Sequence, residues 1–312
     1  MPQQFLGSAS PFIRFLFLLF LALLSFLVLS IAGTLIAIPL FGVSLTDLGT
    51  LPQNLNNPDA IRLLKYLQFV QSFSLFLIPA LLFLLIVRDD GLRSLRLKKF
   101  PGMFQILLVV MLMMALVPLN NLLAEWNSNI HLPDFLGNVE NWIRNMEEKA
   151  TRLTEAFLRM DNFGSFLFNL VLIAVLPAIG EELMFRGAIQ PLMQSWTRNV
   201  HAGIWITAFL FSFFHFQFLG FLPRLLLGAI FGYLFSWSRS LWLPVLAHFV
   251  NNGMAVTFYY VVGQQEVENS VDKIGTAETG AYALLGGIVV SGILFVLYRH
   301  LKSHDGSTRS YS

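Results

Sequence analysis

Two adjacent carboxylates and an arginine interrupt an otherwise apolar stretch of the chain. They are Glu181, Glu182 and Arg186, within a run that extends from about Phe166 to Leu192. About 20 apolar residues suffice to cross a bilayer, so this run is long enough to do so. An ionisable side chain at such a depth is costly unless it is paired or lines a wet cavity, and its presence therefore indicates a functional site.

Helical spacing separates these three side chains. Glu182 and Arg186 are four residues apart, share a helix face and can form an ion pair. Glu181 points about 100° away from that face and has no partner nearby in the sequence. An unpaired carboxylate inside a membrane helix is the most unusual residue in this chain.

Three further polar residues fall inside apolar segments. Of the six histidines, His215 and His248 lie well within such segments, and Asn252 follows His248 by four residues on the same helix face. A single membrane histidine often makes only an interhelical hydrogen bond. Two histidines, an asparagine and a glutamate pair on three different helices instead indicate one shared site.

The composition places these residues in a membrane protein. Of the 312 residues, 56% are hydrophobic and only 12% are charged, about half the charged fraction of soluble domains. The net charge of +2 gives no reason to expect a nucleic-acid partner. The chain has no cysteine, which excludes disulfides, thiol catalysis and thiolate metal ligands.

Hydropathy predicts an all-α, polytopic membrane protein of about eight transmembrane helices, with the polar site in the fourth, fifth and seventh. We expect one integral membrane domain over residues 1–312, with a motif-bearing core at 166–258 and an amphipathic loop at 125–161. The predicted spans are Phe12–Leu40, Leu67–Val87, Met103–Leu123, Phe166–Leu192, His201–Phe218, Phe221–Trp237, Leu241–Val262 and Ala281–Leu297.

Charge in the loops predicts the orientation. With eight spans, the basic residues fall on one side and most acidic loop residues on the other, so the positive-inside rule places both termini in the cytoplasm of a cell whose plasma (inner) membrane holds the protein. Residues 125–161 then lie outside, either as a surface helix or lid or as a connector packed on helix ends. The basic residues are Arg88, Arg93, Arg96, Lys98, Lys99, Arg198, Arg239, Arg299, Lys302 and Arg309.

Buried polar groups that lipid cannot solvate must satisfy one another or water. We therefore expect Glu181, His215, His248 and Asn252 to converge on one pocket. Because His248 lies nearer the cytoplasmic end of its predicted helix, we expect that pocket to open to the cytoplasm.

The ordered motifs resemble those of the CAAX protease and bacteriocin-processing family, integral membrane proteases whose eukaryotic members trim prenylated CAAX proteins. The family pattern of Glu-Glu-xxx-Arg, Phe-xxx-His and His-xxx-Asn is matched here by Glu181–Arg186, Phe211–His215 and His248–Asn252. The match covers about a third of the chain, residues 166–258.

The resemblance implies an intramembrane endopeptidase that acts on membrane-associated or prenylated peptide and protein substrates. It implies that Glu181 and His215 activate water and that His248 and Asn252 stabilise the oxyanion, with Glu182 and Arg186 in support. Members of the family are described both as metalloproteases and as metal-free glutamate proteases. Glu181, His215 and His248 could form a two-histidine, one-carboxylate zinc site, although there is no His-Glu-x-x-His motif, which slightly favours the metal-free alternative.

Two other functions are compatible with a buried Glu/His cluster. A proton- or cation-coupled transporter would use the same side chains as a relay, and such proteins commonly have repeated halves and broken helices. No repeat is visible here, and Pro177–Gly180 is the one obvious weak point of a helix near the carboxylates. A non-catalytic membrane scaffold with the same fold is the third possibility.

Overall fold

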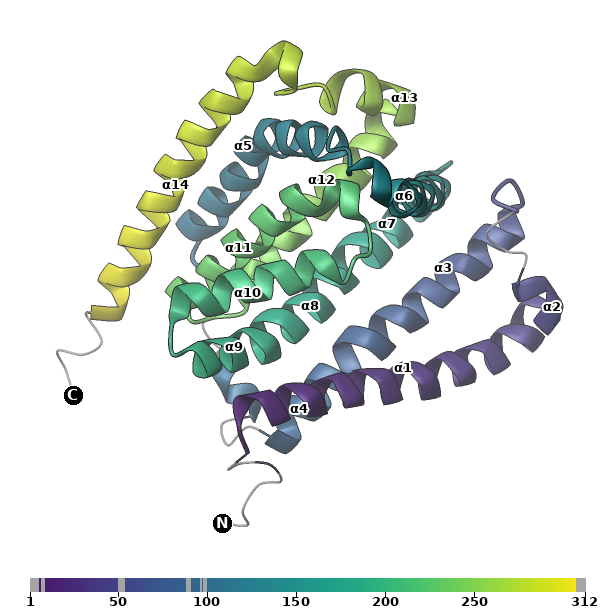
Figure 1. The fold of residues 1–312 in the computed structure, drawn as a ribbon, viewed down its shortest axis with the longest axis horizontal. Helices are drawn as coiled ribbons and strands as arrows, with labels where there is room; N and C mark the ends of the chain where they lie inside the picture. Colours follow the sequence, from purple (N-terminus) through teal and green to yellow (C-terminus); the bar gives the residue numbers. More distant parts are fainter. Residues whose placement is uncertain are drawn as a thin grey trace.

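A computed structural model describes residues 6, 9–49, 54–87, 91–95, 97 and 100–306, and the regular structure within these ranges is entirely helical (Figure 1). The predicted all-α membrane fold is thus confirmed. Within the residues that the structure describes, seven helices are long and apolar enough to cross a bilayer. They are Pro11–Phe41, Pro58–Val87, Met103–Ser128, Phe163–Thr197, Phe218–Ser238, Trp242–Val262 and Ala277–Ser303.

Several of these spans are composite, because they include π-helical (η2, η5, η6) or 3₁₀ (η7, η9) segments; the π-helical η8 and the 3₁₀ segments η3 and η4 lie between spans. The elements are α1 Pro11–Phe41, α2 Leu45–Leu48, α3 Pro58–Ser72, η2 Phe73–Leu77, α4 Ile78–Val87, η3 Gly91–Leu95, α5 Met103–Ser128, η4 Asp134–Leu136, α6 Gly137–Leu158, α7 Phe163–Asn169, η5 Leu170–Val175, α8 Leu176–Glu182, η6 Leu183–Ile189, α9 Gln190–Thr197, α10 Val200–Phe213, η7 Phe218–Gly220, α11 Phe221–Ser238, α12 Trp242–Val262, α13 Gln264–Glu266, η8 Val267–Val271, η9 Ala277–Thr279 and α14 Gly280–Gly306.

The remaining predicted span, His201–Phe218, is a shorter helix than the sequence suggested. α10 has 14 residues, fewer than the roughly 20 that a full crossing needs. The chain leaves the helix after Phe213 and turns at Phe216, whose φ of 53° lies in the left-handed region. His215 therefore lies in the turn between α10 and α11, where its ring is not constrained by a helical backbone.

α1 begins and α14 ends at one end of the bundle, and α6 lies at the other (Figure 1). α9 and α11 end in Arg198 and Arg239, which cap their helices in left-handed conformations. Several of the basic residues used to predict orientation, Arg88, Arg96, Lys98, Lys99 and Arg309, lie outside the described residues. Which end faces the cytoplasm therefore remains a prediction from charge.

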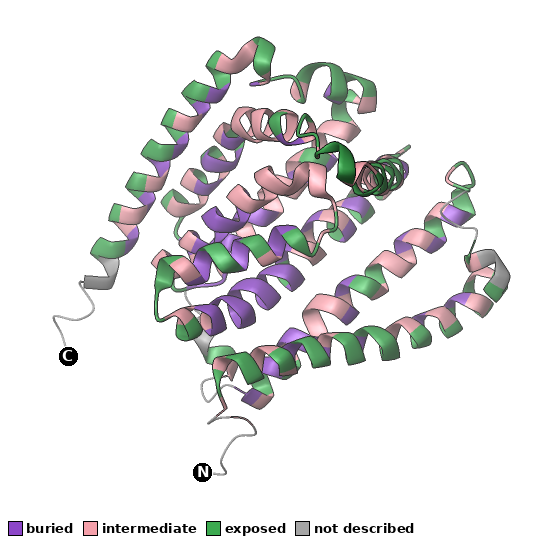
Figure 2. Cartoon of the chain, in the orientation of Figure 1, coloured by how far each residue is buried: buried purple, intermediate pink, exposed green. Residues whose placement is uncertain are grey.

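Burial divides the helices into an interior and a rim (Figure 2). η6 is buried along its whole length, whereas α1 and α14 expose large apolar side chains such as Leu23, which is 68% exposed, and Leu284, which is 71% exposed. Monomeric soluble proteins rarely expose contiguous apolar surface on this scale. The outward faces of the rim helices are therefore suited to contact lipid.

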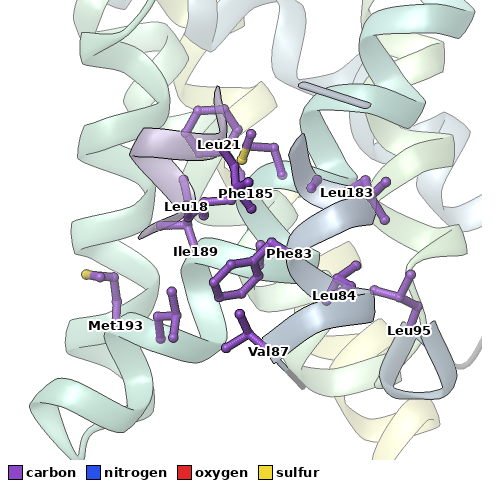
Figure 3. Close-up of a cluster of buried hydrophobic side chains, with 14 of the residues drawn as sticks. Leu18, Leu21, Phe83, Leu84, Val87, Leu95, Leu183, Phe185, Ile189 and Met193 are labelled. Atoms are coloured by element: carbon purple, nitrogen blue, oxygen red, sulfur yellow. The ribbon is translucent and has the colours of Figure 1, made fainter. Parts of the chain in front are cut away.

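A dense apolar cluster holds the central helix in place from the side of α1 and α4 (Figure 3). Phe185 and Ile189 of η6 pack there with Leu18 of α1 and Phe83 of α4. Just before η6, a Cβ on Gly180 would lie 3.3 Å from the Cβ of Phe76, so the absence of a side chain allows η2 to approach closely. This packing fixes the rotation of the helix that presents Glu181.

Candidate active site

The two glutamates end α8, a seven-residue α-helix between two π-helical segments, η5 and η6. π-Helical turns inside longer helices occur frequently at functional sites. Pro177 stands in the first turn of α8 and cannot donate a backbone hydrogen bond to η5. The predicted weak point therefore coincides with a change of helical type immediately before the carboxylates.

Glu182 lies in a dry ionic cluster. One of its oxygens, Oε1, accepts hydrogen bonds from Arg186 Nη1 at 2.9 Å and from His248 Nδ1 at 2.8 Å. Glu182 and Arg186 are both 0% exposed. The predicted ion pair is therefore present, and it also binds the histidine of α12, which lies 66 residues further along the chain.

The guanidinium of Arg186 links the pair to the third helix of the core. Its Nη2 donates to the carbonyl of Gly228 on α11 at 2.9 Å. The rings of Phe211 and Phe231 lie 4.8 and 5.3 Å from its central carbon, within the range of cation–π attraction. A Cβ on Gly228 would lie 3.1 Å from the Cα of Ala208, which accounts for the small residue at this helix crossing.

Glu181 is in a different situation. Its Oε2 atom is buried and has no hydrogen-bond partner among the described residues. His215 Nε2 lies 3.9 Å from that oxygen and His248 Nε2 lies 4.0 Å from it. These separations exceed a direct hydrogen bond, yet two atoms this far apart can both lie within about 3 Å of one water oxygen.

The second nitrogen of each histidine ring determines what the first can do. His215 Nδ1 lies 2.7 Å from the carbonyl oxygen of Phe211, and His248 Nδ1 lies 2.8 Å from the Glu182 carboxylate. Both oxygens can only accept, so we assign a proton to each Nδ1. In the neutral rings both Nε2 atoms are then acceptors that face a third acceptor, Glu181 Oε2, and a water molecule can supply the protons between them.

Asn252 extends the site along α12. Its Nδ2 donates to the carbonyl of Ile173 in η5 at 3.0 Å, and its Oδ1 accepts from Asn251 Nδ2 at 3.1 Å. An amide nitrogen carries two protons, so one N–H of Asn252 is left to donate elsewhere. The oxygen is oriented by its neighbour, which fixes the amide with its nitrogen toward η5.

All four predicted catalytic residues line one cavity of about 400 Å³. Its walls come from α8, the turn after α10, α11, α12, η5, α3 and the C-terminal half of α6. The residues of the site are Glu181, His215, His248 and Asn252, and those contributed by α6 are Leu153, Thr154, Phe157 and Leu158.

α6 forms part of the cavity wall, at the end of the bundle away from the start of α1 (Figure 1). We expected residues 125–161 to lie outside the membrane and the pocket to open to the cytoplasm. Both expectations stay predictions, since a wall contributed by α6 fixes neither the side of the membrane on which this helix lies nor the side to which the cavity opens.

The predicted zinc site receives no support from the geometry. Among the described residues, no group of three or more His, Asp or Glu side chains is arranged to hold a metal ion. Two ligands of a tetrahedral zinc, each about 2.0–2.2 Å from the metal, lie roughly 3.4 Å apart. The distances of 3.9 and 4.0 Å from Glu181 Oε2 to the two Nε2 atoms are longer than that.

The sequence interpretation missed Arg224, which lines the same cavity. Arg224 stands inside the apolar segment predicted as the sixth span, so the rule that identified Glu181, an ionisable residue within a span, would have found it. Gln68 of α3 also lines the cavity. No motif marks this residue, and its position depends on how α3 packs against the core.

Comparison with known proteins finds a family match over the segment that contains Glu181, His215, His248 and Asn252. Residues 163–254 match the family described as type II CAAX prenyl endopeptidase Rce1-like, which confirms the predicted resemblance over that segment. A stretch of 86 residues is 27% identical to the uncharacterized protein YpbD of Bacillus subtilis (strain 168), covering 26% of this chain and 41% of that protein. No solved structure matches the chain. The matched family comprises proteases, and its segment includes every residue of the candidate site.

Proposed function

We propose that this protein is an intramembrane endopeptidase of the CAAX type. The observation that carries the proposal is the convergence of Glu181 Oε2 and the Nε2 atoms of His215 and His248 on one small cavity inside a multi-pass membrane bundle. Glu181 Oε2 and His215 Nε2 are the two acceptors for the protons of one water molecule, and His248 Nε2 faces the same point, where it can contact the tetrahedral intermediate that this water forms.

In the proposed mechanism Glu181 is the general base. Its carboxylate takes a proton from the water that attacks the peptide carbonyl, while His215 Nε2 holds the second water proton as an acceptor. The hydrogen bond from His215 Nδ1 to the Phe211 carbonyl keeps the ring in the required tautomer. Protonated Glu181 can then return the proton to the leaving amine, so the cycle ends with the carboxylate restored.

The developing oxyanion is assigned to His248 and Asn252. His248 can donate through Nε2 when its ring carries a second proton, and the Glu182 carboxylate at Nδ1 stabilises that cationic form. Asn252 contributes the N–H that does not bind Ile173. Donors of this kind, held in place before the reaction, are typical of sites that stabilise tetrahedral intermediates.

A cleavage assay on the purified, full-length protein tests the proposal. Prenylated and non-prenylated peptides of one sequence would be incubated with the protein in neutral-lipid nanodiscs, and products identified by mass spectrometry. We expect an internal peptide bond to be cut by the native protein and not by Glu181→Gln. Absence of cleavage with every peptide would count against a protease, and proton or cation flux in liposomes that depends on Glu181 would favour the transporter.

Metal dependence is measured on the same preparation. We expect less than one zinc per chain by elemental analysis and unchanged cleavage after dialysis against a chelator. Stoichiometric zinc whose removal abolishes cleavage would show that Glu181, His215 and His248 rearrange to bind it.

The orientation is tested with a single cysteine, since the natural chain has none. We expect Asn145→Cys in α6 to react with a membrane-impermeant maleimide added from outside the cell, with a cysteine in the C-terminal tail labelled only after permeabilisation. That result would place α6 and the cavity wall that it forms on the extracytoplasmic side. Labelling of residue 145 only from the cytoplasm would reverse the bundle and invalidate the charge-based orientation.

A further inference from the structure

Arg224 is a half-buried cation that neither the ionic cluster around Glu182 nor the proposed mechanism uses. It stands in the first turn of α11 and lines the cavity together with Glu181 and His215. No ion pair within 4.0 Å joins it to a carboxylate in the described part of the chain, and the acidic groups that face it are Glu147 and Glu181. The positive charge of the Arg224 guanidinium is costly inside an apolar segment unless an anion or water in the cavity compensates it.

The turn before α11 holds the guanidinium with uncharged acceptors. Nε donates to the carbonyl of Gly220 at 3.0 Å, Nη1 to the side-chain oxygen of Gln217 at 2.6 Å, and Nη2 to the Gln217 carbonyl. An arginine side chain has five N–H groups, so two remain after these three bonds. The guanidinium is therefore oriented, and its positive charge is left available.

The backbone at Gly220 lies close against the Arg224 side chain. A Cβ placed on Gly220 would lie 2.5 Å from Arg224 Nη2 and 3.1 Å from its central carbon, so a larger residue would displace the guanidinium. A cation in the first turn also opposes the helix dipole, whose positive end lies there. Helix stability alone therefore gives no reason for arginine at this position.

We propose that Arg224 binds the free α-carboxylate of the substrate peptide and so sets the distance between the cleaved bond and the C-terminus. This proposal rests on the proposed protease function. A cavity of about 400 Å³ holds only a short length of chain, and Arg224 and the water-activating residues belong to that one cavity. Every peptide with an unmodified C-terminus carries an α-carboxylate there. A carboxylate can pair with a guanidinium in a bidentate manner.

Matched peptides test this role. Two peptides of identical sequence, one ending in a free acid and one in an amide, would be assayed with the full-length protein in neutral-lipid nanodiscs. Hydrogen bonds to charged groups contribute roughly 1.5–3 kcal/mol, so we expect kcat/KM to be about 10- to 150-fold higher for the acid. Arg224→Gln should remove the difference in kcat/KM between the acid and the amide, whereas Arg224→Lys should retain part of it.

The outcomes distinguish carboxylate recognition by Arg224 from the protease function on which it rests. Cleavage of neither peptide would refute the protease function, while equal cleavage of both would refute only carboxylate recognition. An acid preference that survives in Arg224→Gln would show that another group binds the carboxylate. If Arg224→Gln does not fold, Gly220→Ala, which keeps the charge and moves the guanidinium, should lower the preference in its place. A requirement for anionic lipid that Arg224→Gln abolishes, with no acid preference, would assign the arginine to a lipid phosphate and overturn the proposal.

Discussion

Glu181 and Glu182 are neighbours on one helix, yet their surroundings differ in almost every respect. Glu182 is fully buried and accepts from a guanidinium and an imidazole through one oxygen. Glu181 faces a cavity with a side chain that is 12% exposed, and its Oε2 has histidine nitrogens only at 3.9 and 4.0 Å. The Glu182 carboxylate is paired within the protein, whereas the Glu181 carboxylate faces the cavity, where a ligand can bind it.

The contrast shows how a single helix can supply both support and chemistry. Successive side chains on an α-helix point about 100° apart, so one turn can face two environments. His248 connects the two, because its Nδ1 contacts Glu182 and its Nε2 faces Glu181. The ionic cluster around Glu182 can therefore determine the orientation and charge of a histidine ring that also lines the cavity.

The largest effect on activity is expected from Glu181→Gln. This change removes the proposed base and nothing that is bonded within the protein, so kcat should fall by roughly 10²- to 10⁴-fold while the melting temperature stays the same. Peptide cleavage and thermal unfolding would be measured on one detergent preparation. Full activity of the variant would contradict the assignment of roles to the two glutamates.

Arg186→Ala should act on stability. It removes both the ion-pair partner of Glu182 and the donor to the Gly228 carbonyl, and it leaves a carboxylate buried. Loss of one member of a buried pair costs roughly 3–5 kcal/mol in soluble proteins. Reversible unfolding in mixed micelles would measure the loss. Arg186→Lys is the matched control, since it keeps the charge without the paired N–H geometry, and its loss should be smaller.

Asn252→Ala should reduce kcat with a smaller change in stability. The substitution removes the proposed oxyanion donor and also one hydrogen bond to Ile173. Removal of one such donor costs about 10²- to 10³-fold in kcat in other acyl-transfer enzymes. Asn251→Ala, which removes only the bond that orients the amide, is the comparison and should cost less. Equal losses of kcat in the two variants would point to a purely structural contribution.

The smallest effect concerns Glu140 on α6, a carboxylate that is paired like Glu182 but outside the membrane. Hydrogen bonds from the Leu132 N–H, His131 and Arg144 lower its pKa to about 2. A lowered pKa in the folded state stabilises the fold above the ordinary value of 4.5, and this contribution is lost as the pH falls from about 4.5 to about 2. Hydrogen-exchange protection factors at the start of α6, which remove the intrinsic pH dependence of amide exchange, should fall over that pH range and should stay constant in Glu140→Gln.

Local spacing was sufficient to predict some of this arrangement. The i, i+4 relation gave the Glu182–Arg186 pair, and hydropathy gave the membrane helices. The hydrogen bond from His248 to Glu182 could not be predicted, because it joins residues 66 apart whose relative rotation depends on packing between helices. The roles that the family resemblance assigns to the site residues remain predictions for the assays above.

The position of α6 was the other feature beyond the reach of sequence. Its amphipathic pattern predicted a helix that lies on a surface, and both a lid and a connector were compatible with that pattern. Four of its side chains form part of the cavity wall, a contact that either alternative allows and that the pattern alone did not predict. Such contacts depend on the short helix α10, whose early end at Phe213 leaves room for the turn that carries His215. Nothing in the apolar run His201–Phe218 marks that end.

The ionic cluster also has a consequence for synthesis. Gly228 and His248 follow their partners Arg186 and Glu182 by 42 and 66 residues, so the helix that carries the charges is made before two of its contacts exist. During that interval only the pair within the helix offsets the cost of placing charge in lipid. The carboxylate acquires its second donor when α12 is inserted. Insertion of α12, rather than formation of the charged helix alone, is therefore the event that completes the hydrogen bonds of the buried carboxylate.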